Sequence, residues 1–275
     1  MSPLALGLAL LAAFMHASWN LLLRRHEDTE AGTALMVCAG CVVVAPLAAA
    51  TWSVQAAVLP YLVASWTFEL AYFVLLAAAY RRAELSLVYP LARGTAPVIV
   101  LVVGVALLGV QPTVPGGFGV LLVGAGILLV RGLRGSRGDT AGALLAVATA
   151  AAIAGYTLVD RVGVTLAGAV TYLELVMVVP GVLYLVAVMY LRGSTYVRAQ
   201  VHPMTVVAGT LMVSAYGLVL LALRLAPAAS VAAVRESGVV MATAMAAVLL
   251  HERVSRERFA GAILVVVGIA ALAVS

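Results

Sequence analysis

Long apolar runs separated by short polar breaks make up most of this chain. A transmembrane helix needs about 20 mostly apolar residues to cross roughly 30 Å of hydrocarbon. Ten runs have about this length, and the breaks between them are too short to hold a soluble domain. The runs are continuous rather than alternating, so we expect an all-α integral membrane protein with ten transmembrane helices. The runs are 4–23, 31–51, 58–80, 85–109, 114–130, 141–160, 166–190, 204–223, 227–250 and 259–274.

The composition supports a membrane environment. Hydrophobic residues form 65% of the chain and charged residues 10%, with a mean hydropathy of +1.16. An ordinary soluble domain has about 45–50% apolar and roughly 25% charged residues. The chemistry of this protein is therefore expected among its helices.

The positive charge follows a topology rule and does not indicate a nucleic-acid partner. The net charge is +5, and all 16 basic residues are arginine. Twelve of them lie in the breaks after the first, third, fifth, seventh and ninth runs. Because positive loops stay in the cytoplasm, we expect a multi-pass protein of the cell (inner, cytoplasmic) membrane with both termini outside. These arginines are Arg24, Arg25, Arg81, Arg82, Arg131, Arg134, Arg137, Arg192, Arg198, Arg253, Arg256 and Arg258.

An internal repeat divides the chain into two units. Sliding the sequence by 142 positions superimposes Arg93 on Arg235, and it also matches arginine, leucine and glycine positions around them. We expect two domains, 1–137 and 138–275, with five helices each. Because five is odd, the second unit enters the membrane from the opposite side, which makes the repeat inverted. Inverted repeats are common in secondary transporters, which bind substrate between the halves.

A short motif near the end of the second unit resembles a known family. His251-Glu252-Arg253-Val254-Ser255, followed by Phe259-Ala260-Gly261 and Gly268, is similar to the EamA-type transporters of the drug/metabolite transporter superfamily. The resemblance covers essentially the whole chain. The first unit departs from the motif, since Val110 stands where the second has Glu252. The resemblance implies a carrier whose central cavity is lined by the first four helices of each unit, and it leaves the substrate open.

Five charged residues lie between the ends of the apolar runs: Glu69, Arg93, Glu174, Arg235 and Glu236. A charge at the bilayer centre costs about 2.5–3.5 kcal/mol, so such residues usually face a cavity or a partner. Arg93 is expected to receive a substrate carboxylate or phosphate. The structural alternative is a buried ion pair with Glu69 or Glu236 that only holds helices together.

The other charges each allow two interpretations. Repeat symmetry places Arg235 at the cavity, which leaves Glu236 to pair with an arginine or to bind a substrate amine. Glu69, with Tyr72 one turn on, is either an ion-pair or hydrogen-bond partner or a carboxyl that couples transport to a proton. Glu174 is nearer a helix end, where a packing or interfacial role is favoured.

Polar and aromatic side chains complete the expected site. His16, Trp19 and Asn20 are three and four positions apart and share one helix face, suited to a polar ligand or to a satisfied interhelical histidine. Tyr156 is the counterpart of Trp19 in the second unit. The predicted substrate-binding residues are Arg93, Tyr89, Trp19, His16, Asn20, Glu69, Tyr72, Tyr156, Tyr216, Arg235 and Glu236.

We therefore expect a secondary active transporter that moves a zwitterionic amino acid or related polar metabolite by alternating access. The alternative is a carrier of quaternary amines or other organic cations, held by Trp19 and tyrosines through cation–π contacts. A membrane enzyme is disfavoured because the sequence contains no G-x-S-x-G or H-E-x-x-H motif, and a channel is a further alternative. We expect no cofactor and no metal site, and a monomer or homodimer in the lipid bilayer.

Overall fold

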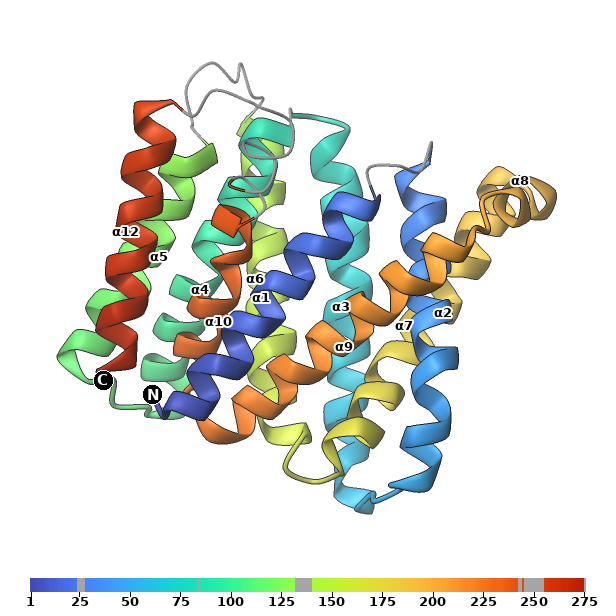
Figure 1. The fold of residues 1–275 in the computed structure, drawn as a ribbon, viewed down its shortest axis with the longest axis horizontal. Coiled ribbons are helices and arrows are strands. Elements are labelled where there is room, and N and C mark those ends of the chain that lie inside the picture. The colour runs from blue at the N-terminus through green and yellow to red at the C-terminus, as the bar shows by residue number, and fades with distance from the viewer. Residues whose placement is uncertain (24–27, 84, 132–139, 242–243, 245–254, 275) are drawn as a thin grey trace.

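The computed structural model describes residues 1–23, 28–83, 85–131, 140–241, 244 and 255–274. In these ranges the chain is helical, apart from turns, connecting segments and one isolated β-bridge between Val54 and Ala167. The helices pack as a bundle, and both ends of the described chain lie on the same side of it (Figure 1). In chain order they are α1 Pro3–Leu23, α2 Thr29–Ala50, η1 Ala56–Val58, α3 Leu59–Tyr80, α4 Leu85–Leu108, α5 Val114–Arg131, α6 Thr140–Gly163, α7 Ala169–Arg192, α8 Ser194–Ala199, α9 Pro203–Leu225, α10 Ala228–Glu236 and α12 Arg256–Ala273.

The long helices coincide with the apolar runs of the sequence to within a few residues. Seven of them are long and apolar enough to cross a membrane, while α5 and α12 are shorter apolar helices. The expectation of an all-helical membrane protein is therefore confirmed for the described residues. The short helices η1 and α8 were not predicted from the sequence, because each is too short to produce an apolar run.

The expected run at 227–250 is interrupted. Helix α10 ends at Glu236, residue 237 forms a turn, and residues 238–241 are helical again. The hydroxyl of Ser237 donates to the Val234 carbonyl at 2.6 Å, a backbone contact that serine makes in competition with the helix ladder. The described chain thus contains a break beside Arg235 and Glu236, where the sequence predicted one continuous helix.

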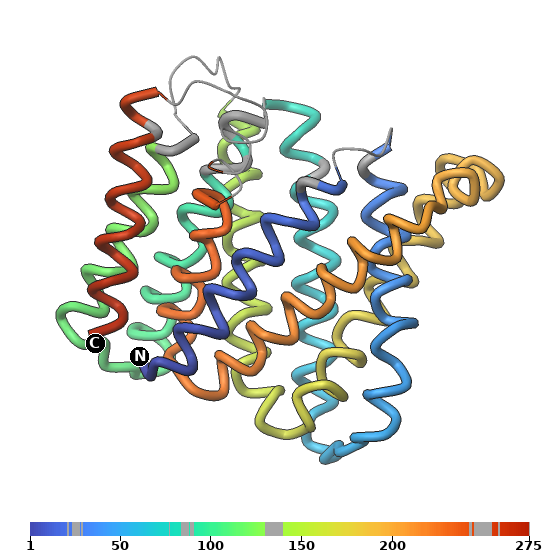
Figure 2. Tube along the Cα trace, in the orientation of Figure 1, coloured from blue at the N-terminus to red at the C-terminus, as the bar shows by residue number. Residues whose placement is uncertain are grey.

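Small residues bring the helices of the two halves into close contact. A Cβ added to Gly119 of α5 would lie 2.8 Å from the Gly268 carbonyl of α12, and one added to Gly126 would lie 2.6 Å from the Gly261 carbonyl. These helices run side by side at one edge of the bundle (Figures 1 and 2). Because helices in lipid associate through close packing rather than a hydrophobic driving force, these glycines, which are seven positions apart in each helix, act in packing.

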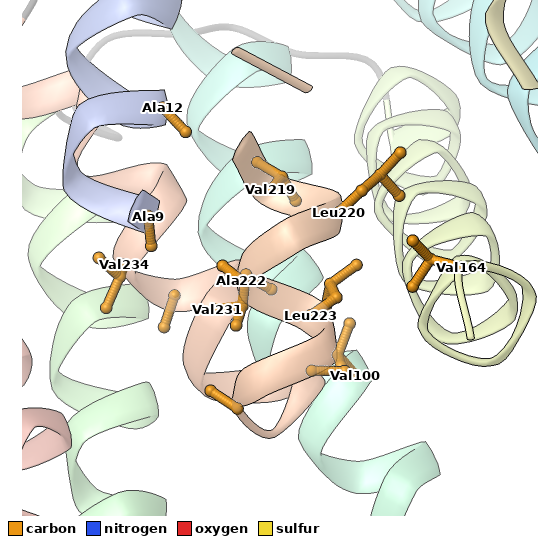
Figure 3. Close-up of a cluster of buried hydrophobic side chains, with 14 of the residues drawn as sticks. Ala9, Ala12, Val100, Val164, Val219, Leu220, Ala222, Leu223, Val231 and Val234 are labelled. Atoms are coloured by element: carbon orange, nitrogen blue, oxygen red, sulfur yellow. The ribbon is translucent and has the colours of Figure 1, made fainter. Parts of the chain in front are cut away.

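The largest buried cluster joins elements from both halves. Valines, leucines and alanines of α9, α10 and α1 meet beside Val100 of α4 and Val164, which directly follows α6 (Figure 3). Most of these side chains are short, so the backbones of the helices approach closely. This packing fixes α10, and with it Arg235 and Glu236, against α1 and α4.

The two ends of the bundle are held differently. At the end near the termini, the Gln55 amide donates to the Leu166 carbonyl at 3.0 Å and the Gly168 amide donates to the Ser53 carbonyl at 2.8 Å. At the opposite end, Arg192 forms salt bridges with Asp28 and Glu30 at 3.6 and 3.2 Å, and half of its side chain is exposed. One end is therefore joined by main-chain hydrogen bonds and the other by ion pairs of a half-exposed arginine.

Candidate functional site

A cavity of about 350 Å³ lies inside the bundle. Helices of both halves line it: α1, α2, α3 and α4 from the first, and α6, α7, α9 and α10 from the second. Its walls extend from Ala12 and Arg235 to Leu23, Glu30 and Tyr80. Because Leu23 and Tyr80 end α1 and α3 and Glu30 begins α2, the cavity reaches the end of the bundle away from the termini (Figure 1).

A carboxylate shared by two guanidinium groups is the most concentrated charge at this site. Oε1 of Glu236 accepts from Nη1 of Arg93 at 3.2 Å and from Nη2 and Nε of Arg235 at 3.1 and 3.3 Å. The side chains of Arg93, Arg235 and Glu236 are 11%, 6% and 3% exposed. With two positive charges and one negative, this triad carries a net charge of +1 in a shielded position.

Helix α1 contributes a polar face next to the triad. Nε1 of Trp19 donates to Nδ1 of His16 at 3.3 Å, and the two rings meet edge to face with centroids 4.9 Å apart. Nε2 of His16 lies 3.5 Å from Nη2 of Arg93. Asn20 donates its side-chain amide to the His16 carbonyl at 2.8 Å. The three residues that share a helix face in the sequence thus form one connected group at the cavity.

Aromatic rings form a second wall. The ring of Tyr156 lies between those of Tyr72 and Tyr216, with edge-to-face contacts at 6.4 and 6.2 Å. Cζ of Arg235 is 6.0 Å from the centre of the Tyr156 ring, within the range of a cation–π contact. Nearer the mouth, Phe73 and Tyr184 stack with centroids 4.6 Å apart. The cavity is therefore largely apolar, with polar groups confined to a few positions.

Two buried carboxyl groups lie on the aromatic side. Glu69 of α3 lines the cavity and is 6% exposed. Asp160 of α6 is fully buried and accepts from the hydroxyl of Tyr172 at 2.7 Å and from the hydroxyl of Tyr216. Tyr216 itself lines the cavity. Asp160 therefore holds a lining side chain in place through its hydrogen bond, without lining the cavity itself.

Asp160 was missed by sequence reasoning. It falls at the end of the apolar run 141–160, where a boundary residue is normally assigned to the interface. A signal was present, because Asp160 lies one helical turn after Tyr156 and therefore shares its face. The two tyrosines that bind it come from α7 and α9. The sequence around Asp160 does not indicate these contacts, because the partners lie in other helices.

The structure brings most of the predicted residues together. His16, Trp19, Asn20, Glu69, Tyr72, Arg93, Tyr156, Tyr216 and Arg235 all line the cavity, and Glu236 joins it through the two arginines. The side chain of Tyr89 lies outside the described residues, as does the segment 251–254 of the sequence motif. Glu174 is not among the lining residues; its Oε2 is buried without a hydrogen-bond partner in the described ranges.

A bundle of long apolar helices around a charged internal cavity indicates a multi-pass membrane protein. Residues 140–274 match the family model of the EamA-like transporter family. This part of the chain, which contains the motif, therefore matches the EamA-like transporter family, and proteins of that family are transporters rather than enzymes.

Comparison with solved structures supports the fold. A crystal structure of another protein superposes with a TM-score of 0.78 at 18% sequence identity, covering 98% of this chain and 96% of that one. At this identity the similarity concerns the fold alone. No curated protein matches the chain.

Proposed function

We propose that this protein is a secondary active transporter for a small zwitterionic metabolite, an amino acid or a related compound. The observation that supports this most directly is the separation of charge in the cavity. The triad of Arg93, Glu236 and Arg235 presents a net positive charge from α4 and α10, while Glu69 supplies a carboxyl from α3. A ligand with one anionic and one cationic group matches both.

The size of the cavity favours a small ligand. Ligand pockets are usually about 300–1,000 Å³, and this one, at about 350 Å³, is near the lower limit. Its aromatic wall accommodates an apolar side chain or the face of a ring. The guanidinium group of Arg93 suits a carboxylate because its planar fork donates two parallel hydrogen bonds.

Alternating access between two inverted units is the mechanism we propose. Gly119 packs against Gly268 and Gly126 packs against Gly261, so each glycine of α5 meets the repeat counterpart of the other. The contact of α3 with α6 likewise has a counterpart in that of α1 with α9. These pairings support ten helices in two domains, 1–137 and 138–275. A broken helix beside the charged residues is a recurrent feature of transporters with inverted repeats.

The cavity opens toward the cytoplasm in this proposal. Its mouth lies at the end of the bundle that carries the arginine-rich breaks of the sequence, and such loops stay inside. The main-chain contacts at residues 53–55 and 166–168 then close the external side. We place the protein in the cell (inner) membrane, as a monomer or homodimer without cofactor or metal. Proton coupling through Glu69 is part of the proposal.

A carrier of quaternary amines is the second candidate. Trp19, Tyr72, Tyr156 and Tyr216 could surround such a cation through their ring faces. The two arginines disfavour it, because they repel a permanent cation in a shielded cavity and Arg235 already lies over the Tyr156 ring.

Counterflow in liposomes tests the proposed function. Purified protein is reconstituted, the vesicles are loaded with an unlabelled compound, and uptake of its labelled form is measured for amino acids, amines, sugars and nucleosides. We expect saturable uptake of at least one zwitterion, accelerated by substrate on the far side. Uptake confined to quaternary amines would establish the second candidate, and flux that never saturates would indicate a pore.

A further inference from the structure

Asp160 determines the direction of the hydrogen bond made by Tyr216. An ionised carboxylate only accepts hydrogen bonds, and each oxygen of Asp160 receives one tyrosine hydroxyl. Oδ1 accepts from Tyr172 at 2.7 Å, and Oδ2 accepts from Tyr216. A tyrosine hydroxyl has a single hydrogen to donate. Because Tyr216 donates it to Asp160, the oxygen of Tyr216 acts toward any further partner as an acceptor.

The two tyrosines differ in their position relative to the cavity. Tyr216 of α9 is a lining residue, whereas Tyr172 of α7 and Asp160 of α6 are fully buried and are not among the lining residues. A group that reaches the Tyr216 oxygen from the cavity must therefore be a donor. A lining oxygen of this kind favours ligands that carry N–H or O–H groups.

The carboxyl group of Glu69 belongs to the same wall of the cavity. Glu69 and Tyr72 are three positions apart on α3 and share a helix face. The ring of Tyr72 contacts that of Tyr156, which in turn contacts the ring of Tyr216. Glu69 and Tyr216 both line the cavity. The tyrosine wall therefore combines a carboxyl group with a hydroxyl oxygen that accepts.

We propose that Glu69 and Tyr216 form the subsite for the ammonium group of the ligand, and that Asp160 is a positioning residue that keeps the Tyr216 oxygen an acceptor. This inference rests on the proposed function and deepens it, because it assigns the cationic end of the zwitterion to named groups. A primary ammonium group has three N–H donors. One donates to the carboxyl group of Glu69 and a second to the oxygen of Tyr216.

The need for a donor separates two kinds of organic cation. A quaternary ammonium is attracted by a carboxylate and by ring faces, but it has no N–H group to donate to the Tyr216 oxygen. A primary ammonium has the same charge and makes the hydrogen bond as well. The subsite therefore selects an ammonium group with N–H donors, and Tyr216 is a specificity-determining residue.

Saturation-transfer NMR with two matched probes tests this subsite without requiring transport. Butylammonium and butyltrimethylammonium have the same chain and the same charge, but only the first has N–H donors. We expect the wild type to bind butylammonium saturably and more tightly. Tyr216→Phe retains the ring and removes the oxygen. It should weaken butylammonium binding roughly tenfold, near the lower limit for a hydrogen bond to a charged group, and leave butyltrimethylammonium binding unchanged.

Tyr172→Phe is the matched control, because it removes the other hydrogen bond of Asp160 without altering a lining residue. It should leave the ratio of the two affinities at its wild-type value. Asp160→Leu tests the positioning role, since the Tyr216 hydroxyl is then free to turn its hydrogen toward the cavity. We expect the preference for butylammonium to fall roughly threefold, equivalent to part of one hydrogen bond. A purely structural role would weaken both probes equally and leave the ratio unchanged.

Four outcomes would overturn the inference. They are equal affinity of the wild type for both probes, no saturable binding of butylammonium, an equal loss of both probes in Tyr216→Phe, and a change of the ratio in Tyr172→Phe as large as that in Tyr216→Phe. An unchanged ratio in Asp160→Leu would remove Asp160 from the subsite.

The two proposals can fail separately. A preference for butylammonium that depends on Tyr216, in a protein that transports no zwitterion, would retain the subsite and reject the proposed function. Transport of an amino acid with the same KM in wild type and Tyr216→Phe would do the reverse.

Discussion

Arg93 and Arg235, which occupy equivalent positions in the sequence repeat, share a single carboxylate oxygen, because Oε1 of Glu236 accepts from both guanidinium groups at 3.2 and 3.1 Å. Arg93 has Gly94 where Arg235 has Glu236. The carboxylate of Glu236 has no counterpart in the first half, yet it binds the arginines of both halves. It therefore links α4 of the first half to α10 of the second.

Glu236→Gln should destabilise the protein. Removing one partner from a buried ion pair typically costs about 3–5 kcal/mol, and here two guanidinium groups lose their counter-charge. We expect a lower unfolding temperature in detergent. Glu30→Gln, an exposed ion-pair partner, is the control and should change stability little. An unfolding temperature equal to wild type would contradict this role of Glu236.

Arg93→Ala should abolish transport while the protein still inserts and folds. Arg93→Lys keeps the charge but loses the planar fork, so we expect transport at least about tenfold below wild type, equivalent to one charge-assisted hydrogen bond. Arg224→Ala is the control, since this arginine is exposed. The measurement is initial uptake at equal protein density, and unchanged flux in the Arg93 variants would exclude this residue from the binding site.

Glu69→Gln should remove the response of transport to a pH gradient. A carboxyl that carries the coupled proton must bind and release it during each cycle, and a carboxamide does neither. Uptake is measured in liposomes with equal and unequal internal and external pH. Tyr72→Phe, one turn away on the same helix, is the control. It alters a residue that lines the cavity but leaves the carboxyl group of Glu69 in place. A gradient response that persists in Glu69→Gln would locate the coupling site elsewhere.

Asp160→Asn should lower stability more than Tyr172→Phe. The carboxylate of Asp160 accepts from two tyrosine hydroxyls in a fully buried position. An amide presents donors to one of them, whereas Tyr172→Phe removes a single hydrogen bond, worth about 0.5–1.5 kcal/mol. Thermal unfolding of both variants gives the comparison. Equal stabilities would show that Asp160 is not a structural acceptor.

Gly126→Ala and Gly117→Ala should have opposite effects, although both lie on α5. A Cβ at Gly126 would meet the Gly261 carbonyl at 2.6 Å, while none of the described atoms lies within 4 Å of a Cβ at Gly117. Replacing a glycine inside a helix by alanine normally stabilises by roughly 0.5–1 kcal/mol. We expect a higher unfolding temperature for Gly117→Ala and a lower one for Gly126→Ala.

The sequence predicted the positions of the long helices, but it did not predict which distant side chains contact each other. Apolar runs locate the long helices because the bilayer imposes a length and an apolar composition on each crossing. The repeat was visible in matched arginine, leucine and glycine positions, and the glycines recur because close packing of membrane helices requires small residues. The charges at Arg93, Arg235 and Glu236 were visible because charge is rare among apolar residues.

What could not be predicted depends on distant parts of the chain. The pairing of Arg93 with Glu236 rather than Glu69 follows from how α4 and α10 pack, and Asp160 is buried by tyrosines from two other helices. The break at Ser237 depends on one hydroxyl that turns back to the Val234 carbonyl. No periodicity in the sequence encodes any of these contacts.

The different connections at the two ends of the bundle imply different sensitivities to salt. Ion pairs between exposed groups weaken as ionic strength rises, because the Debye length falls from about 10 Å at 0.1 M to about 3 Å at 1 M. This applies to the pair of Arg192 and Glu30, in which about half of each side chain is exposed, and less to Asp28, which is 10% exposed. The main-chain bonds at residues 53–55 and 166–168 carry no net charge. If the protein works by the alternating access proposed above, potassium chloride alone should shift the balance between its two orientations.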